Sequence, residues 1–399
     1  MTQTAASSGR RASSPAASFF RSRWVNPPPN VEELDPARLA PEFRAAGVAC
    51  GLKGGGNTDV GLLTCDADTT RSTLLLTRNA AAAAPVRVCR RECDAGSIQA
   101  AVVNSGNANA ATGERGYRDA VEMRDAAAAA LDLDPASVAV AETGAIGVPL
   151  AIDAVKRGIA AAAGALSEGG GELFARAIMT TDRGPKRCTV RCEGVTVSAQ
   201  AKGAGMIEPR FATLLCFVQT DAEIPDPERT FRAAVAGSFE RVTVDGQMST
   251  NDTVLLQSTG SSGRPLPDGL LDSVLLQLAL EVVADGEGAT RVGRVEVSGA
   301  AGDEEAERVA RAVANSPLVK AALYGRHANW GRVAQAAGMA LAGEELEELG
   351  PEHVDADEFG ADLGEAEIAV RLERGEGSAV IYFSDLTHGY VELNSEYPT

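Results

Sequence analysis

Residues 202–221 read KGAGMIEPRFATLLCFVQTD. A glycine-rich stretch leads into the apolar run 214–218, which predicts a buried β-strand. Thr213 therefore stands at a junction between a loop and a strand, directly after the small residue Ala212. A threonine in such a place ordinarily reflects β propensity alone.

The same junction also has a chemical interpretation. A threonine hydroxyl is a weak nucleophile unless a base lies beside it. If the Ala212–Thr213 bond is cut, Thr213 gains a free α-amine with a pKa of about 7.7–8.0, which suits a base near neutral pH. Flexible Gly203 and Gly205 upstream would let the scissile peptide reach a strained conformation. Thr213 is therefore the candidate nucleophile, and Ala212–Thr213 the candidate self-cleavage point.

The composition is that of a globular protein with no affinity for polyanions. A length of 399 residues exceeds what one hydrophobic core usually supports, so two lobes are expected. The net charge of −18 disfavours binding to nucleic acid and to anionic membranes. Seven scattered cysteines indicate a reducing, cytoplasmic compartment, and with only three histidines no metal site is expected. No apolar run approaches the ~18 residues of a membrane span.

Helical and strand patterns are mixed along the chain. Residues 117–131 predict an Ala-rich helix, and Asp226 followed by proline predicts the start of another. A strand at 294–298 precedes a helix from Asp303, and the alternation over 367–383 predicts a β-hairpin. Strict βαβ alternation is missing. The predicted fold class is α+β, with layered mixed sheets flanked by helices and a second, smaller α/β lobe.

The N-terminal region differs in composition from the rest. Residues 1–25 are rich in Ala, Ser and Arg and contain no Asp or Glu, and three prolines follow at 27–29. We expect a disordered leader over residues 1–40. An α chain, 41–212, and a β chain, 213–399, then follow and contribute to one shared core.

Ordered blocks over roughly residues 45–399 resemble the ornithine acetyltransferase family, whose members also act as glutamate N-acetyltransferases. The family motif is K-G-x-G-M, a short spacer and P-x-x-A-T, and residues 202–213 match it. The further matching blocks are VVNSGNANAATG at 102–113, ETGAIGVPL at 142–150, AIMTTD at 177–182, STNDTVLL at 249–256, DGEGAT at 285–290, NSPLVK at 315–320, NWGRV at 329–333 and DLTHGYVELNSEYPT at 385–399. The chain departs from the family at His327-Ala328, where Asp-Pro is common, and at Phe211, where methionine is common.

The resemblance implies a role for several residues. Thr213 corresponds to the nucleophile and Ala212–Thr213 to the processing bond, while Thr143 and Gly144 correspond to the pair that stabilises the oxyanion. A hydroxyl and a glycine amide are suitable donors for one oxygen, although a Thr-Gly pair is also an ordinary turn. The implied substrate-binding residues are Thr180 (with Thr181 as an exchangeable neighbour), Lys202, Thr213, Glu287, Asn394 and Thr399. Lys202 would meet a carboxylate and Glu287 an amine.

The implied activity is ping-pong acetyl transfer from N2-acetylornithine, or an ornithine-like N-acetyl amino acid, to glutamate through an acetyl-threonine. No metal or tightly bound cofactor is implied, and acetyl-CoA is a second donor in some members. The implied partners are small amino-acid substrates, and the implied assembly is a heterotetramer of two α and two β chains. Three alternatives stay open: a related self-processing aminopeptidase, an uncleaved binding protein, and a paralogue in secondary metabolism with another donor or acceptor.

Overall fold

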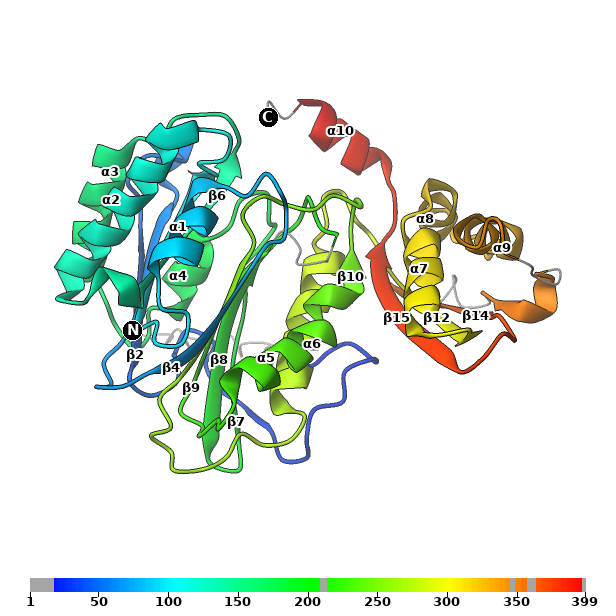
Figure 1. Ribbon diagram of the computed structural model, residues 1–399, viewed down its shortest axis with the longest axis horizontal. Coiled ribbons are helices and arrows are strands. Elements are labelled where there is room, and N and C mark those ends of the chain that lie inside the picture. The colour runs from blue at the N-terminus through cyan, green and yellow to red at the C-terminus, as the bar shows by residue number, and fades with distance from the viewer. Residues whose placement is uncertain (1–17, 209–213, 345–348, 357–363, 397–399) are drawn as a thin grey trace, which may run out of the picture.

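The computed structural model describes residues 18–208, 214–344, 349–356 and 364–396. These residues form an α+β fold of three mixed sheets with helices on their faces, as predicted (Figure 1). Two of the sheets belong to a larger lobe and the third to a smaller one. The expected cleavage point, Ala212 and Thr213, lies outside the described residues, as do Thr399 and residues 1–17 of the expected leader.

The central layer is a six-stranded sheet in the order β1-β7-β8-β9-β11-β4. Its strands are β1 (Glu32–Glu33), β4 (Arg71–Leu76), β7 (Lys186–Cys192), β8 (Val195–Lys202), β9 (Leu215–Thr220) and β11 (Thr253–Ser258). β9 is the strand predicted from the apolar run after Thr213, and all of its residues are buried. Cys216 packs in one core, with α5 (Pro227–Ala236) and α6 (Leu270–Ala284), and Phe217 in another, against the next sheet. Burial on both faces explains why the run is continuously apolar.

The second sheet has the order β2-β3-β5-β6. Its strands are β2 (Phe43–Val48), β3 (Val60–Cys65), β5 (Ala100–Asn107) and β6 (Val138–Ala145). The 3-10 turns are η1 (Gly54–Gly56), η2 (Pro135–Ser137), η3 (Phe239–Arg241) and η4 (Pro351–His353). β5 and β6 run parallel, so their carboxyl ends meet at one edge of the sheet. This edge carries Thr143 and Gly144.

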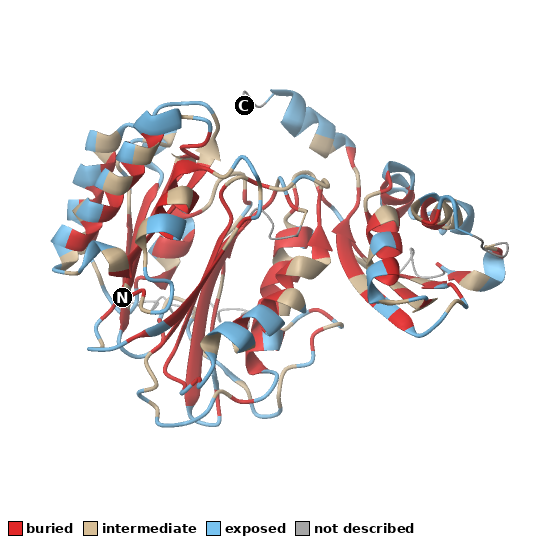
Figure 2. Ribbon diagram, in the orientation of Figure 1, coloured by how far each residue is buried: buried red, intermediate tan, exposed pale blue. Residues whose placement is uncertain are grey.

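The helices cover both sheets of the larger lobe and also pack on the third sheet. They are α1 (Ala84–Glu92), α2 (Gly113–Leu131), α3 (Ile152–Ala163), α4 (Gly171–Ala177), α5 (Pro227–Ala236), α6 (Leu270–Ala284), α7 (Asp303–Ala314), α8 (Pro317–Tyr324), α9 (Trp330–Ala340) and α10 (His388–Glu396). The helices predicted at 117–131, after Asp226 and from Asp303 are therefore confirmed. α4 contacts strands of both sheets and lies between them. Figure 2 shows the buried residues on the strands and on the inward faces of the helices.

The third sheet corrects one prediction. Its order is β10-β15-β12-β14-β13. The strands are β10 (Val242–Thr243), β12 (Val292–Ala300), β13 (Val354–Asp355), β14 (Glu365–Arg371) and β15 (Gly377–Ser384). The expected hairpin over 367–383 is wrong, because β12 lies between β14 and β15 and pairs with both. The connecting loop bends round the end of β12, where Leu372 N donates to Ser298 O and Arg374 N to Gly299 O.

The described part of the expected leader is also not disordered. From residue 18 the chain packs along α6, where Ser22 N donates to Gln277 Oε1 at 3.2 Å. Val25 is buried in the core, and the Trp24 ring lies 5.3 Å from that of Tyr382. β1 then pairs with β7. The expectation failed for residues 18–40 because a few large apolar side chains supply enough buried area to order a segment of otherwise low complexity. Among the described helices, none is long and apolar enough to cross a membrane.

Candidate active site

A cavity of about 260 Å³ collects most of the predicted site residues. Its lining includes Thr143, Gly144, Thr180, Lys202, Glu287 and Asn394. These residues come from β6, β8, α10 and the loops after α4 and α6, so the cavity lies where separate elements of the fold meet. α10 leads from the end of β15 back toward the larger lobe (Figure 1). The structure therefore brings together every described residue for which the sequence suggested a role.

Thr143 and Gly144 are held by the parallel pairing of β5 and β6. The register is irregular at Asn107, which pairs with both Thr143 and Ala145. Gly144 has a φ of +134°, and a Cβ built on it would lie 2.3 Å from the backbone carbon of Gly106. No other residue fits there without moving the neighbouring strand. The glycine thus allows the ends of β5 and β6 to approach closely, and both Gly144 and Thr143 line the cavity.

Lys202 ends β8 and is 3% exposed. Its Nζ donates a hydrogen bond to Thr143 Oγ1 at 3.2 Å. Burial lowers the pKa of Lys202, and the negative charge of Asp182 opposes this change. The lysine therefore brings its side-chain nitrogen to the wall of the cavity, within hydrogen-bond distance of the threonine hydroxyl.

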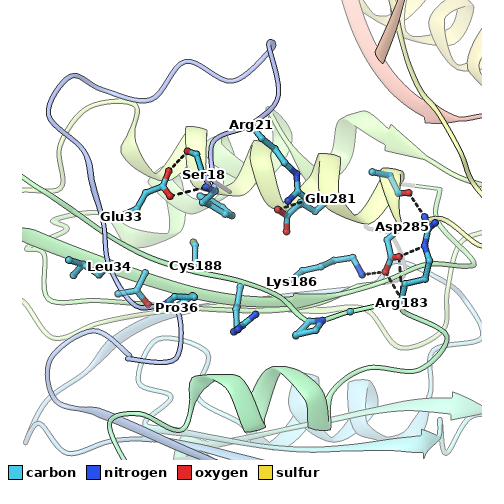
Figure 3. Close-up of a pocket in the computed structure, with 16 residues that line it drawn as sticks. Ser18, Arg21, Glu33, Leu34, Pro36, Arg183, Lys186, Cys188, Glu281 and Asp285 are labelled. Atoms are coloured by element: carbon cyan, nitrogen blue, oxygen red, sulfur yellow. Dashed lines mark hydrogen bonds and ion pairs between the residues drawn. The ribbon is translucent and has the colours of Figure 1, made fainter. Parts of the chain in front are cut away.

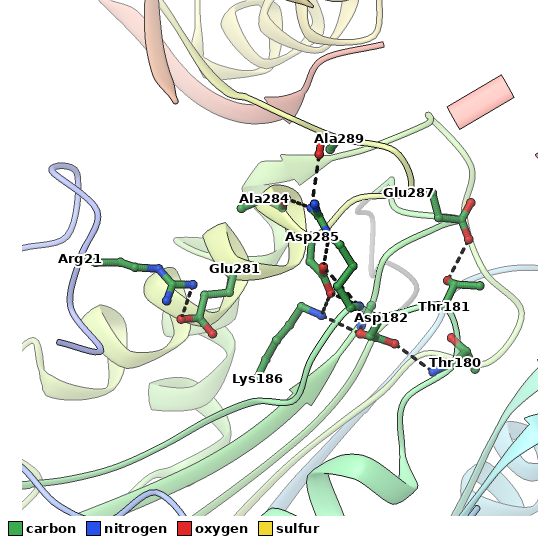
Figure 4. A network of polar contacts seen from close by, with 12 residues as sticks. Arg21, Thr180, Thr181, Asp182, Lys186, Glu281, Ala284, Asp285, Glu287 and Ala289 are labelled. Atoms are coloured by element: carbon green, nitrogen blue, oxygen red, sulfur yellow. Dashed lines mark hydrogen bonds and ion pairs between the residues drawn. The ribbon is translucent and has the colours of Figure 1, made fainter. Parts of the chain in front are cut away.

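Asp182 lies at the centre of a polar network that includes Thr180, Lys186 and Asp285 (Figure 4). Its carboxylate accepts hydrogen bonds from Thr180 N at 2.9 Å, from Gly203 N at 2.8 Å and from Lys186 Nζ at 2.7 Å. Burial alone would raise the pKa of Asp182, but the charges of Lys186 and Lys202 bring it below its usual range. Lys186 also pairs with Asp285 at 2.5 Å. This buried network fixes the strand that carries Lys202.

Glu287 also lines the cavity. Its carboxylate accepts hydrogen bonds from Thr181 Oγ1 and from Asn394 Nδ2, each at 2.9 Å. A Cβ on Gly205 would lie 2.6 Å from the Glu287 carboxyl carbon, so the glycine makes room for this side chain. Among the described residues, no cation pairs with Glu287. Thr181, rather than Thr180, contacts the acid, while both threonines line the cavity.

Several lining residues had no predicted role. Asp245 accepts from Met206 N at 2.6 Å and Ile207 N at 2.9 Å, and burial raises its pKa. Asn251 donates from Nδ2 to Ala108 O at 2.7 Å and to Glu142 O at 2.9 Å. Asn251 thereby ties the start of β11 to the ends of β5 and β6. In the sequence, only its place in the matched block 249–256 pointed to a functional role for Asn251. Nothing in the sequence pointed to a role for Asp245.

A second and larger cavity, about 680 Å³, lies between the N-terminal segment, β7 and α6 (Figure 3). None of the predicted site residues lines it. Several of its charged side chains pair with one another: Arg21 pairs with Glu281 at 2.9 Å, and Lys186 and Arg183 both pair with Asp285. The smaller cavity is thus the better candidate. In the described part of the chain, no group of three or more His, Cys, Asp or Glu is arranged to hold a metal ion.

Comparison with known proteins matches residues 44–399 to the ArgJ family. The chain is 42% identical over 295 residues to an arginine biosynthesis bifunctional protein ArgJ of Geobacter sulfurreducens, covering 66% of this chain and 75% of that protein. It is 39% identical over 404 residues to the protein of the same name from Mycolicibacterium paratuberculosis, covering 92% and 99%. A crystal structure of an ornithine acetyltransferase complexed with ornithine, from Mycobacterium tuberculosis, is 36% identical, with a TM-score of 0.43, over 45% of this chain and 98% of that one.

Proposed function

The chain belongs to the ArgJ family, and we propose that it is a glutamate N-acetyltransferase that takes its acetyl group from N2-acetylornithine. The observation that supports this most is the gathering of Thr143, Gly144, Lys202, Glu287 and Asn394 around one cavity. They come from four regions of the sequence, so chance clustering of unrelated polar residues is a poor explanation.

The first step is self-cleavage. The Thr213 hydroxyl attacks the carbonyl carbon of Ala212, and the peptide nitrogen leaves with a proton, so that an ester replaces the amide. Water then hydrolyses the ester, which leaves a carboxylate on Ala212 and a free α-amine on Thr213. The two resulting chains are 41–212, with the leader, and 213–399.

Acetyl transfer uses the same hydroxyl. The α-amine of Thr213 takes the hydroxyl proton as the oxygen attacks the acetyl carbonyl. The Thr143 hydroxyl and the Gly144 amide donate to the oxygen of the tetrahedral intermediate. The donor's amine leaves as it receives the proton, and the acetyl group stays on Thr213. The amine of glutamate then attacks this ester and releases the enzyme with the acetyl group transferred.

Substrate recognition follows from the charges in the cavity. Glu287 has hydrogen-bond donors but no cation beside it among the described residues, so the side-chain ammonium of an ornithine-like donor supplies the missing charge. The Lys202 ammonium, which lines the same cavity, suits the α-carboxylate. A donor that carries both a carboxylate and an ammonium therefore matches the two charges of the cavity. Thr180 and Asn394 line the same cavity. The family resemblance adds Thr399, which lies outside the described residues, as a further substrate contact.

The finer properties carry over from the family resemblance as part of this proposal. Catalysis needs no metal or bound cofactor. Acetyl-CoA serves as a second donor of the acetyl group that Thr213 carries. The enzyme assembles from two α and two β chains and works in the cytoplasm, which agrees with its seven free cysteine thiols.

One assay tests the proposal against its alternatives. Purified protein is incubated with N2-acetylornithine and glutamate, and ornithine and N-acetylglutamate are both quantified. We expect the two products in equal amounts. Release of ornithine without N-acetylglutamate would indicate a hydrolase. Transfer of the acetyl group only to an amine other than glutamate would indicate a paralogue that acts in a different pathway.

A further inference from the structure

The hydrogen bond between Lys202 and Thr143 joins two different sheets at the cavity wall. Lys202 Nζ lies 3.2 Å from Thr143 Oγ1, and the two residues are 3% and 6% exposed. Across the described residues, Thr143 is the one hydrogen-bond partner of this ammonium, and no carboxylate lies within ion-pairing distance of it. Thr143 thus supplies the one direct hydrogen-bond acceptor of a buried ammonium, while the charges of Asp182, Asp252 and Glu287 act on that ammonium from beyond ion-pairing distance.

The direction of this bond has a consequence for the threonine. An ammonium has only donors, so the Thr143 oxygen must act as the acceptor. The hydroxyl hydrogen is then left to point away from Lys202, and both residues line the cavity. A hydroxyl that accepts from a cation is also polarised, and so donates more strongly to a negative oxygen. Lys202 thus orients and polarises the Thr143 hydroxyl so that it can donate a hydrogen bond to the oxyanion.

A hydrogen bond of the neighbouring residue holds the backbone at Lys202 in place. Gly203, the next residue, donates its N–H to Asp182, which also binds Lys186. This contact holds the end of β8, while the pairing of β5 and β6 holds Thr143. The two partners are thus anchored separately, and the geometry between them is set before any substrate binds.

We propose that Lys202 acts through Thr143 to stabilise the oxyanion, in addition to meeting the substrate carboxylate. Lys202 is a positioning residue in this role, because it polarises and orients the hydroxyl that touches the reacting oxygen. The proposal rests on the proposed function, which assigns the oxyanion to Thr143 and Gly144.

The test uses an acetyl donor without a carboxylate. p-Nitrophenyl acetate acetylates Thr213 and releases a coloured product, and the rate is expressed per mole of free Thr213 N-terminus to correct for incomplete processing. Wild type, Lys202→Met, Thr143→Val and the double variant form a cycle, and Lys156→Met, on an exposed surface, is the matched control. Lys202→Met should lower the maximal acetylation rate about tenfold or more, with little change in the half-saturating concentration. In the Thr143→Val background the same change should have a much smaller effect.

A Lys202→Met rate equal to that of wild type would overturn the proposal and restrict the lysine to carboxylate binding. An equal loss in both backgrounds would also overturn it, because the lysine would then act independently of Thr143. If N2-acetylornithine leaves no acetyl group on wild-type Thr213 while Thr213 is free, the proposed function itself fails.

Discussion

Asp252 Oδ1 accepts a hydrogen bond from the backbone N–H of Leu214, with 3.0 Å between the two atoms. Leu214 directly follows Thr213, and Asp252 directly precedes β11, whose Thr253 pairs with Leu215 of β9. The carboxyl is buried, and burial raises its pKa well above the usual range. The parallel pairing of β9 and β11 therefore places a buried acid against the first described residue of the proposed β chain.

Asp252→Ala should lower the free energy of unfolding and slow self-cleavage. The substitution leaves the Leu214 N–H buried without an acceptor, which costs about 1–3 kcal/mol. Asp252→Asn keeps an oxygen acceptor of the same size and is the matched control. Denaturant unfolding and the time course of cleavage on gels measure both effects. Equal stability and processing of wild type and Asp252→Ala would contradict the anchoring role.

Thr143→Ala should reduce turnover by roughly 10²–10³-fold, because it removes one donor to the oxyanion. The backbone of β6 and the Gly144 amide remain, so substrate affinity should change little. Steady-state kinetics with N2-acetylornithine and glutamate give kcat and KM separately. Turnover at the wild-type level would mean that the Thr-Gly pair has only a structural role.

Glu287→Gln should lower kcat/KM for N2-acetylornithine about tenfold or more, equivalent to a loss of at least about 1.4 kcal/mol in transition-state binding. The amide keeps the shape of the side chain but removes the charge that faces the donor ammonium. Self-cleavage should persist, since Glu287 has no part in it. The same preparation is assayed for processing and transfer, with Glu168→Gln on the exposed surface as control. If acetyl transfer is unchanged, Glu287 does not take part in substrate recognition. If self-cleavage is lost, Glu287 is required for the folded structure, and the recognition role is unsupported.

The buried carboxyl group of Glu142 should lower the free energy of unfolding as pH rises. Burial raises its pKa from 4.5 to about 8, so the folded state binds a proton that the unfolded state releases. The free energy of unfolding therefore falls as pH rises from 4.5 through 8, by at most about 1.4 kcal/mol per unit of this shift. Glu142→Gln does not titrate and can still accept from Asn109 Nδ2, which lies 2.9 Å from the carboxylate. The variant should gain stability relative to wild type across this window; a pH-independent difference would contradict the assignment.

Local patterns were enough to predict elements whose burial depends on one periodic face. The strand after Thr213 and the helix at α7 are examples. The hairpin over 367–383 failed because strand pairing depends on β12, which precedes it by some 70 residues. The alternation of apolar and polar residues predicts a strand, but it does not predict which strand pairs with it.

The residues of the site were predicted from the family resemblance and not from local sequence patterns. The roles of Thr143, Glu287 and Asn394 came from the family resemblance, and the structure adds that they face one cavity. The contact of Lys202 with Thr143 joins two sheets, and the pairing of Lys186 with Asp285 crosses about 100 residues of sequence. Neither leaves a local pattern, so only the folded arrangement could reveal them.

The central claim is that Thr213 carries the acetyl group during transfer. Intact mass spectrometry of purified protein, before and after incubation with N2-acetylornithine alone, tests it most directly. We expect two fragments, the smaller beginning at Thr213, and a gain of one acetyl group on that fragment that disappears when glutamate is added. An unmodified fragment, an acetyl group elsewhere, or an active chain that remains uncut at Ala212–Thr213 would contradict the claim.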